Sequence, residues 1–245
     1  MELTIIGRCG GFPLPGEATS GYLLRCAGKN ILIDCGSAVA SGLFRFLPIE
    51  SLDLLLLSHL HHDHQADLGV LKYAIGMSRR FGITIPDLPV YLPAGPSGLR
   101  PDADGVLDLH TIGPDTRIDL PGIAIRFVQG AHPVESYGIR VACDGKTFAY
   151  TGDTRMCDNV ADMVRDADLA VMDAGSLERL RSADMVHMTA RECAESAEQG
   201  RVIRPILSHI VPLIDAGETL REANAICRRA EIARPLGVYT IGGAL

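Results

Sequence analysis

The feature that most constrains this chain is a cluster of histidines directly after its most apolar run. The run Leu52–Leu57 contains five leucines, and the chain then changes abruptly to polar residues. A short apolar run that stops in this way is typical of a buried strand whose end delivers side chains to a site. Four of the eight histidines follow within six residues: His59, His61, His62 and His64. A solvated or helix-capping loop would rarely gather so many, so we interpret the segment as a metal-binding loop.

The spacing of these residues indicates two ions rather than one. In an extended segment residues two apart point the same way, so His59 and His61 can converge on one ion. If the chain then turns into a helix, Asp63 and His64 are directed toward a second ion. Imidazole and carboxylate groups are the usual ligands of zinc and of other borderline divalent metals.

The order His-x-His-x-Asp-His in residues 59–64 resembles the metal motif of the metallo-β-lactamase fold superfamily, and other patterns extend the resemblance over nearly the whole chain. Asp34–Gly36, after a predicted strand, resembles the first motif of the superfamily. Tyr150–Thr154 resembles its Tyr-x-Gly-Asp-Thr pattern, and His132 follows a strand at the place of its third motif. His187–Ala190 resembles the His-x-Thr-Ala motif of the ribonuclease Z-like and phosphodiesterase branch, to which the chain is most similar.

The resemblance implies an α/β fold, a four-layer αββα sandwich, formed by residues 1–245 as a single domain whose two β-rich halves meet near residue 115. It also implies the ligand set. One ion would be held by His59, His61 and His132, the other by Asp63, His64 and His209, with Asp153 bridging the two. We expect two divalent ions, with zinc favoured and manganese, nickel or iron possible in similar ligands. Asp34 is expected to support the metal loop by hydrogen bonds rather than to bind metal.

This ligand set predicts a dinuclear hydrolase that uses a metal-bridging hydroxide. Asp63 would orient the hydroxide or accept its proton, and His187 would stabilise an oxyanion or protonate the leaving group. The favoured activity is that of a phosphodiesterase. A thioesterase or lactonase of the glyoxalase II-like kind is the alternative, since that branch does not need the His187 motif. An oxygen-reducing di-iron protein is disfavoured because its relatives replace the second histidine, here His61, with glutamate. The role of Asp173, which stands where ribonuclease Z has glutamate, is left open.

The composition limits the range of substrates that we expect and indicates the cellular compartment. The net charge is −7 and no lysine-rich or arginine-rich run occurs, whereas proteins that grip many phosphates show a basic face. Residues 85–113 also leave no room for the exosite arm with which ribonuclease Z holds tRNA. We therefore expect a small-molecule or short oligonucleotide substrate. Seven scattered cysteines, no signal peptide and no long apolar run predict a cytoplasmic protein without membrane contact. A homodimer is possible, as in relatives.

Hydrophobic periodicity and turn residues predict the remaining elements. Helices are expected over residues 37–47, 68–81, 158–166 and 218–230, and a further helix is expected to begin after Thr189. Asp67 would cap the helix over 68–81. Thr189 would cap its own helix, with Glu192 as its capping-box partner. Residues 85–113 are rich in proline and glycine and hold one clear strand, Val90–Leu92. His110, in this stretch, is interpreted as a structural or surface residue.

Overall fold

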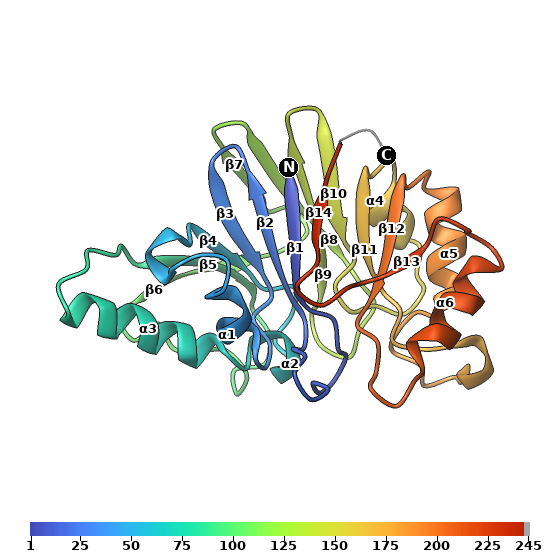
Figure 1. Cartoon of the computed structure of the whole chain (residues 1–245), viewed down its shortest axis with the longest axis horizontal. Helices are drawn as coiled ribbons and strands as arrows, with labels where there is room; N and C mark the ends of the chain where they lie inside the picture. The colour runs from blue at the N-terminus through green and yellow to red at the C-terminus, as the bar shows by residue number, and fades with distance from the viewer. Residues whose placement is uncertain (243–245) are drawn as a thin grey trace.

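The computed structural model describes residues 1–242 and contains two seven-stranded β-sheets that lie face to face (Figure 1). The first sheet has the order β14-β1-β2-β3-β4-β5-β6, and the second β13-β12-β11-β10-β9-β8-β7. The strands of the first sheet are β1 (Glu2–Gly7), β2 (Gly21–Cys26), β3 (Lys29–Ile33), β4 (Leu54–Leu56), β5 (Leu88–Pro93), β6 (Leu107–Ile112) and β14 (Val238–Thr240). Those of the second are β7 (Arg117–Leu120), β8 (Ile123–Gln129), β9 (Tyr137–Cys143), β10 (Lys146–Tyr150), β11 (Leu169–Asp173), β12 (Arg204–Ser208) and β13 (Glu231–Ile232). The chain passes from one sheet to the other between Ile112 and Arg117, and β14 returns to the first sheet.

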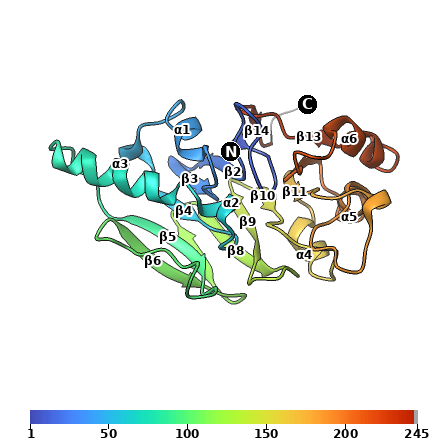
Figure 2. The ribbon, with the colours of Figure 1, turned by 90° about the horizontal axis from the view of Figure 1, so that it is seen from below.

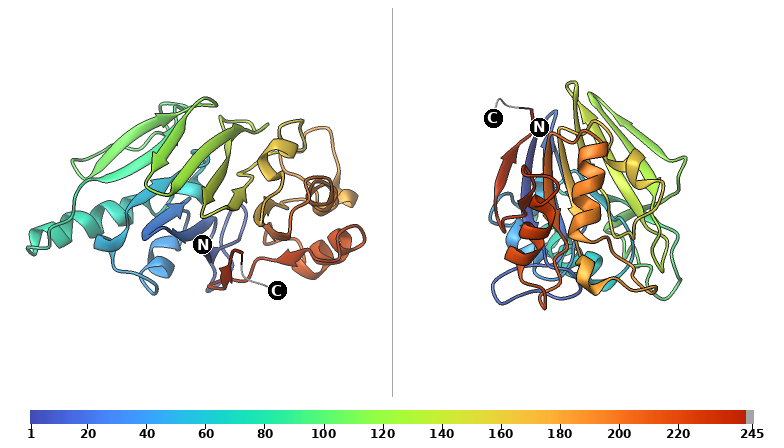
Figure 3. Two further views of the ribbon diagram at one scale, coloured as in Figure 1. Left: turned by 90° about the horizontal axis from the view of Figure 1, so that it is seen from above. Right: turned by 90° about the vertical axis from the view of Figure 1, so that its right-hand side faces the viewer.

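Helices cover the outer face of each sheet (Figures 1 and 3). The α-helices are α1 (Val39–Leu43), α2 (His62–Gln65), α3 (Leu68–Arg80), α4 (Val160–Val164), α5 (Ala190–Gln199) and α6 (Ala216–Asn224). One apolar cluster fills the space between the sheets, a second joins the first sheet to α1 and α3, and a third joins the second sheet to α4, α5 and α6. Two sheets flanked by helices form four layers, which confirms the predicted αββα sandwich. Within residues 1–242, none of the helices is both long and apolar enough to cross a bilayer.

The sheets place several strand ends at one edge of the molecule. β3, β4, β5 and β6 are parallel to one another, as are β10, β11, β12 and β13. The carboxyl ends of parallel strands meet at the same edge, so the segments after β4, β10, β11 and β12 come together. In Figure 2, which looks at the molecule from below, α2 and the neighbouring connections lie along this edge.

Three predicted helices are shorter in the structure than their sequence patterns indicate. The helix expected over 37–47 is regular only in α1, because Ala38 adopts a left-handed conformation (φ 67°) and residues 44–47 continue as turns. The helix expected over 158–166 is limited to α4, and that over 218–230 ends at Asn224. After α6 the chain continues in turns that bury Cys227 and Ala230 against the outer core.

Two further expectations need correction. Residues 85–113 hold two strands rather than one, because β6 pairs in parallel with β5 over six residues. β6 is an edge strand with only its two end residues buried, so its sequence lacks the apolar pattern of a central strand. The Asp67 side chain does not cap α3; its Oδ2 accepts a hydrogen bond from the Ala40 backbone N–H (2.9 Å) and so ties α3 to α1.

Candidate metal centre

The histidine loop begins at the end of β4 and changes conformation at His61. His61 is still extended (φ −66°, ψ 151°) and stands at the N-cap of α2, whose single turn contains Asp63 and His64. His59 and His64 are buried. The change from extended chain to helix directs the first two histidines and the next two ligands to different points, which is the arrangement that the spacing predicts.

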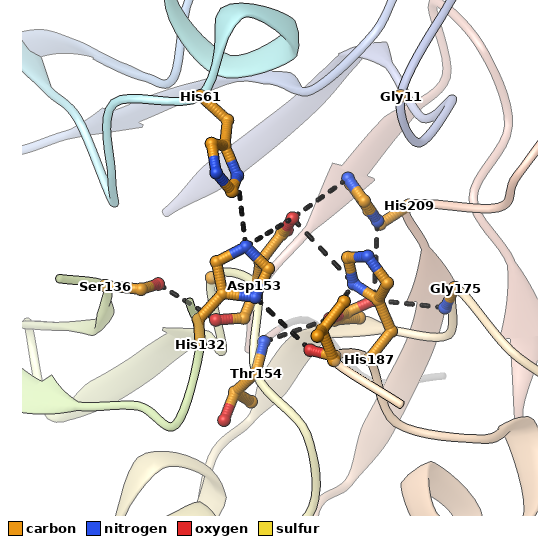
Figure 4. Close-up of polar contacts among 12 residues, drawn as sticks. Gly11, His61, His132, Ser136, Asp153, Thr154, Gly175, His187 and His209 are labelled. Atoms are coloured by element: carbon orange, nitrogen blue, oxygen red, sulfur yellow. Dashed lines mark hydrogen bonds and ion pairs between the residues drawn. The ribbon is translucent and has the colours of Figure 1, made fainter. Parts of the chain in front are cut away.

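The first cluster consists of three histidines and one carboxylate, of which Figure 4 labels His61, His132 and Asp153. His61 Nδ1 lies 3.1 Å from His59 Nε2 and 3.1 Å from His132 Nε2. Asp153 Oδ2 is 3.6 Å from His59 Nε2. His132 comes from the loop after β8 and Asp153 from the loop after β10, so both sheets contribute to the cluster.

The second cluster shares Asp153 with the first. His209, which follows β12, places Nε2 at 3.1 Å from Asp63 Oδ2 and 3.3 Å from His64 Nε2. Asp153 lies 3.2 Å from His209 Nε2 through Oδ2 and 3.3 Å from His64 Nε2 through Oδ1. The possible ligand atoms within each cluster lie within 4.8 Å of one another. The structure therefore brings the seven predicted ligands into two adjoining groups joined by Asp153.

The donor atoms fit a pair of bound divalent ions. Ring nitrogens of different imidazoles converge to 3.1–3.3 Å from one another within each cluster. Asp153 Oδ1 is buried and forms no hydrogen bond with any residue in 1–242. Burial acts to raise the pKa of Asp153, but the surrounding histidines, His209 first, hold it well below its ordinary value. Nitrogen and carboxylate donors in this number suit zinc and similar ions.

Asp34 holds the loop from behind. Its carboxylate accepts hydrogen bonds from the Ser58 N–H (2.8 Å), the Ser58 hydroxyl (2.9 Å) and the Tyr150 hydroxyl (2.8 Å). It also lies 2.7 Å from His64 Nδ1, which leaves Nε2 of that ring for an ion. Partners of this kind fix the orientation of a ligating imidazole. The expected supporting role of Asp34 is therefore visible in its contacts.

Glycines allow the backbone to approach the ligands closely. Gly11 donates its N–H to Asp63 Oδ2 at 2.8 Å. A Cβ on Gly10 would lie 2.7 Å from His209 Nδ1, and one on Gly36 would lie 1.9 Å from the Asp63 carbonyl oxygen. Such contacts exclude every side chain, so these glycines belong to the frame of the site.

His187 lies beside the two clusters and is joined to them by Asp173 (Figure 4). His187 Nδ1 is 2.9 Å from Asp173 Oδ2 and 3.8 Å from Asp153 Oδ2. Asp173 Oδ1 accepts a hydrogen bond from the Gly175 N–H (3.0 Å) and lies 3.4 Å from His209 Nδ1. Burial acts to lower the pKa of His187, but the Asp173 carboxylate outweighs it, and the pKa is raised above its ordinary value.

Asp173 is the residue whose role the sequence left open. In the structure this one carboxylate contacts both His187 and His209, and it also accepts the Thr154 N–H at 3.0 Å. The sequence signal that pointed to a role for Asp173 in the site was its position at the end of a buried parallel strand. The other two histidines lie elsewhere: His62 is exposed on α2, and His110 stacks on Tyr91 at the edge of the first sheet.

Comparisons with known proteins agree with this geometry. A family model described as a β-lactamase superfamily domain matches residues 29–210. The probable metallo-hydrolase YhfI of Bacillus subtilis (strain 168) is 34% identical over 230 residues, covering 91% of each chain. Its crystal structure, that of a metallo-β-lactamase fold protein, superposes with a TM-score of 0.90 at 30% identity, covering 97% of this chain and 98% of YhfI.

Two more distant proteins share the architecture. A ribonuclease Z of Mycobacterium bovis (strain BCG / Pasteur 1173P2) is 26% identical over 252 residues, covering 89% of each chain. The crystal structure of a diphosphatase from the PhnP family superposes with a TM-score of 0.73 at 19% identity, covering 98% of this chain and 97% of the other, which is a likeness of fold.

Proposed function

This chain belongs to the β-lactamase superfamily and is a metallo-hydrolase of that fold, and from this premise we propose that it is a phosphodiesterase acting on small or single-stranded phosphodiesters. The observation that carries the proposal is the contact of His187 with Asp173, directly beside the bridging position of Asp153. A general acid in this place serves a reaction in which an alkoxide leaves. The name of one relative, a ribonuclease Z, supports a phosphodiester substrate, and the name of the diphosphatase supports only the broader class of hydrolysis at phosphorus.

Each group of the site has a part in this reaction. His59, His61 and His132 would hold one ion, Asp63, His64 and His209 the other, with Asp153 between them. Bound ions of this kind supply a Lewis acid and lower the pKa of water toward neutrality. Asp63 is held by the Gly11 N–H and can orient the attacking water or accept its proton.

His187 supplies the proton for the leaving group. Asp173 accepts from Nδ1, which leaves Nε2 as the ring nitrogen that meets the substrate. The raised pKa keeps the ring protonated further into the neutral range. An imidazolium at this point can also stabilise negative charge on a phosphoryl oxygen.

The test compares His187→Ala with wild type, both loaded with zinc or manganese. Substrates are bis-p-nitrophenyl phosphate, an alkyl phosphodiester, cyclic nucleotides, thioesters and lactones. We expect wild type to hydrolyse phosphodiesters faster than the other substrates. His187→Ala should keep its metal, and its turnover of the alkyl phosphodiester should fall ~10²–10³-fold. The loss of turnover should be smaller for bis-p-nitrophenyl phosphate, because its leaving group, p-nitrophenolate, departs without protonation.

His110→Ala is the matched control, since it removes a histidine that stacks on Tyr91 away from the metal ligands. It should leave turnover unchanged. Equal alkyl phosphodiester rates for wild type and His187→Ala would contradict the proposal, and faster hydrolysis of thioesters or lactones would favour that alternative instead.

A further inference from the structure

The segment that carries His187 is a loop whose two ends lie side by side. Residues 177–188 form this loop between β11 and α5. At its base, Ser176 donates its N–H to the Met188 carbonyl at 3.1 Å, and the Ser176 carbonyl accepts the Ala190 N–H at 3.0 Å. Compact surface loops of this length with adjoining ends are often functional. His187 stands next to the base, so the place of its backbone depends on what holds the two ends.

The loop reaches the candidate metal centre through two neighbouring residues (Figure 4). The Val186 carbonyl lies 3.2 Å from His132 Nδ1, which leaves Nε2 of that ring for an ion. His187 Nδ1 lies 2.9 Å from Asp173 Oδ2. The same imidazole packs against Gly175, where a Cβ would be 2.9 Å from His187 Cγ. A shift of the loop would therefore move the imidazole away from its carboxylate partner.

The middle of the loop has little to hold it in place. Residues 179–184 are exposed. Among residues 1–242, the part of the loop from 182 to 187 forms one backbone–backbone hydrogen bond, from the Met185 N–H to the Ser182 carbonyl at 3.4 Å. A segment with exposed backbone and few hydrogen bonds opens at low cost in free energy. The anchors at its ends must therefore keep His187 in position.

One carboxylate of the neighbouring helix α6 binds both ends of the loop. α6 packs beside α5 (Figure 1). Glu222 Oε1 accepts the Arg191 N–H, in the first turn of α5, at 3.0 Å. Both carboxylate oxygens of Glu222 accept the Glu178 N–H, at 3.1 and 3.0 Å. These N–H groups begin helical turns and so lack a partner within the turn, and a charged acceptor makes such hydrogen bonds stronger.

We propose that Glu222 is a positioning residue for His187: one carboxylate holds both ends of the loop, and the loop holds the imidazole against Asp173. This inference rests on the proposed function, in which His187 protonates the leaving group. Glu222 binds backbone, so it fixes the path of the chain itself. Glu218, one turn earlier on α6, instead pairs with the exposed side chain of Arg179. Exposed ion pairs contribute little to stability.

Turnover of two phosphodiesters tests this role, with excess zinc so that metal occupancy does not limit the rate. Glu222→Ala should lower kcat on an alkyl phosphodiester ~10–100-fold, because a small displacement of the acid slows proton transfer. The loss should be smaller on bis-p-nitrophenyl phosphate, whose leaving group needs no proton. When His187→Ala is already present, Glu222→Ala should cause no further loss on the alkyl substrate, since both changes remove one contribution.

Two further variants complete the comparison. Glu222→Gln keeps one oxygen that can accept the Glu178 and Arg191 N–H groups, so its alkyl phosphodiester rate should lie between those of wild type and Glu222→Ala. It also carries the comparison of the two substrates if Glu222→Ala does not fold. Glu218→Ala is the matched control, since it removes a carboxylate from the same helix that meets a side chain of the loop rather than its backbone. It should behave like wild type on both substrates.

Amide hydrogen exchange of the zinc-loaded protein measures the loop without reference to turnover. Exchange in residues 177–191 should be at least about tenfold faster in Glu222→Ala than in wild type, and unchanged in Glu218→Ala. Unchanged exchange in Glu222→Ala would overturn the proposal. Equal losses on the two substrates would do so too, as would a full further loss in the double variant. Equal alkyl phosphodiester rates for wild type and His187→Ala would instead contradict the proposed function, and the exchange rates would then decide whether Glu222 holds the loop.

Discussion

Gly36 has no functional side chain, yet the geometry of the site depends on it. It follows Asp34 by two positions and lies against the backbone of the metal loop, where a Cβ would be 1.9 Å from the Asp63 carbonyl oxygen and 2.1 Å from Thr19 Oγ1. The first of these contacts is with backbone, so rotation of a side chain cannot relieve it. The position of Asp63 and His64 therefore depends on the absence of a methyl group at residue 36.

We predict that Gly36→Ala displaces the α2 turn and lowers metal affinity by about 10–100-fold, as loss of a supporting contact does. Metal content after dialysis against a weak chelator measures the effect. Gly98→Ala is the control, since a Cβ there meets nothing within 4 Å. Equal metal retention by both variants would show that the loop accommodates the methyl group.

At the scale of elements, the start of α5 determines where His187 stands. Thr189 caps the helix through a capping box: Glu192 donates its N–H to Thr189 Oγ1 (3.1 Å), and Thr189 donates its own to Glu192 Oε2 (2.9 Å). The neighbouring backbone is tied to the loop after β11 through Ser176, which bonds Met188 and Ala190. His187 is held between these contacts and Asp173, so the predicted capping box also serves the site.

Thr189→Ala is expected to cost ~1 kcal/mol of unfolding free energy. It should also lower phosphodiester turnover about tenfold, because a small displacement of His187 from its reactive position slows the reaction. Asp215→Ala is the matched control, since Asp215 caps α6 by accepting the Glu218 N–H at 2.8 Å. Urea denaturation and steady-state kinetics should show similar stability losses but a rate loss only in Thr189→Ala. A rate loss of the same size in both would assign the effect to general destabilisation.

At the scale of the molecule, the candidate ligands come from both sheets. His59, His61, Asp63 and His64 follow β4 of the first sheet, whereas His132, Asp153 and His209 follow strands of the second. Ions bound between these ligands would join the two halves of the sandwich. A ligand that binds only the folded state stabilises that state, so the ions should raise the stability of the protein.

We predict two divalent ions per chain and a marked loss of stability when they are removed. Free metal at about a thousand times its dissociation constant contributes ~4 kcal/mol. For a protein of this size that corresponds to a fall in Tm of about 10 °C upon chelation. Elemental analysis and calorimetry before and after chelation measure both, and added zinc should restore the Tm. His187→Ala should behave like wild type, since it is not among the predicted ligands. An unchanged Tm after both ions are lost would contradict the joining role.

The sequence alone determined the parts of this protein that depend on neighbouring residues. The leucines of β4 and the histidines after them predict a strand end and a two-way division of ligands, because side-chain direction follows local conformation. Asp144 and Gly145 form the tight turn between β9 and β10 with positive φ at both residues, a conformation that this pair of residue types favours. Thr189 and Glu192 predict the start of α5 for the same reason.

Only the tertiary structure decided what depends on distant residues. His132, Asp153 and His209 were assigned from the resemblance to a family, because no local pattern states that three strand ends meet at one edge. β6 is a strand because β5 offers it a parallel partner. The helices α1, α4 and α6 are shorter than their sequence patterns indicate, and after α6 the chain continues in turns that bury Cys227 and Ala230 against the outer core. Asp173 contacts both His187 and His209, whose sequence distances from it are 14 and 36 residues. A local pattern determines the direction of a side chain, but only the packed sheets determine what it meets there.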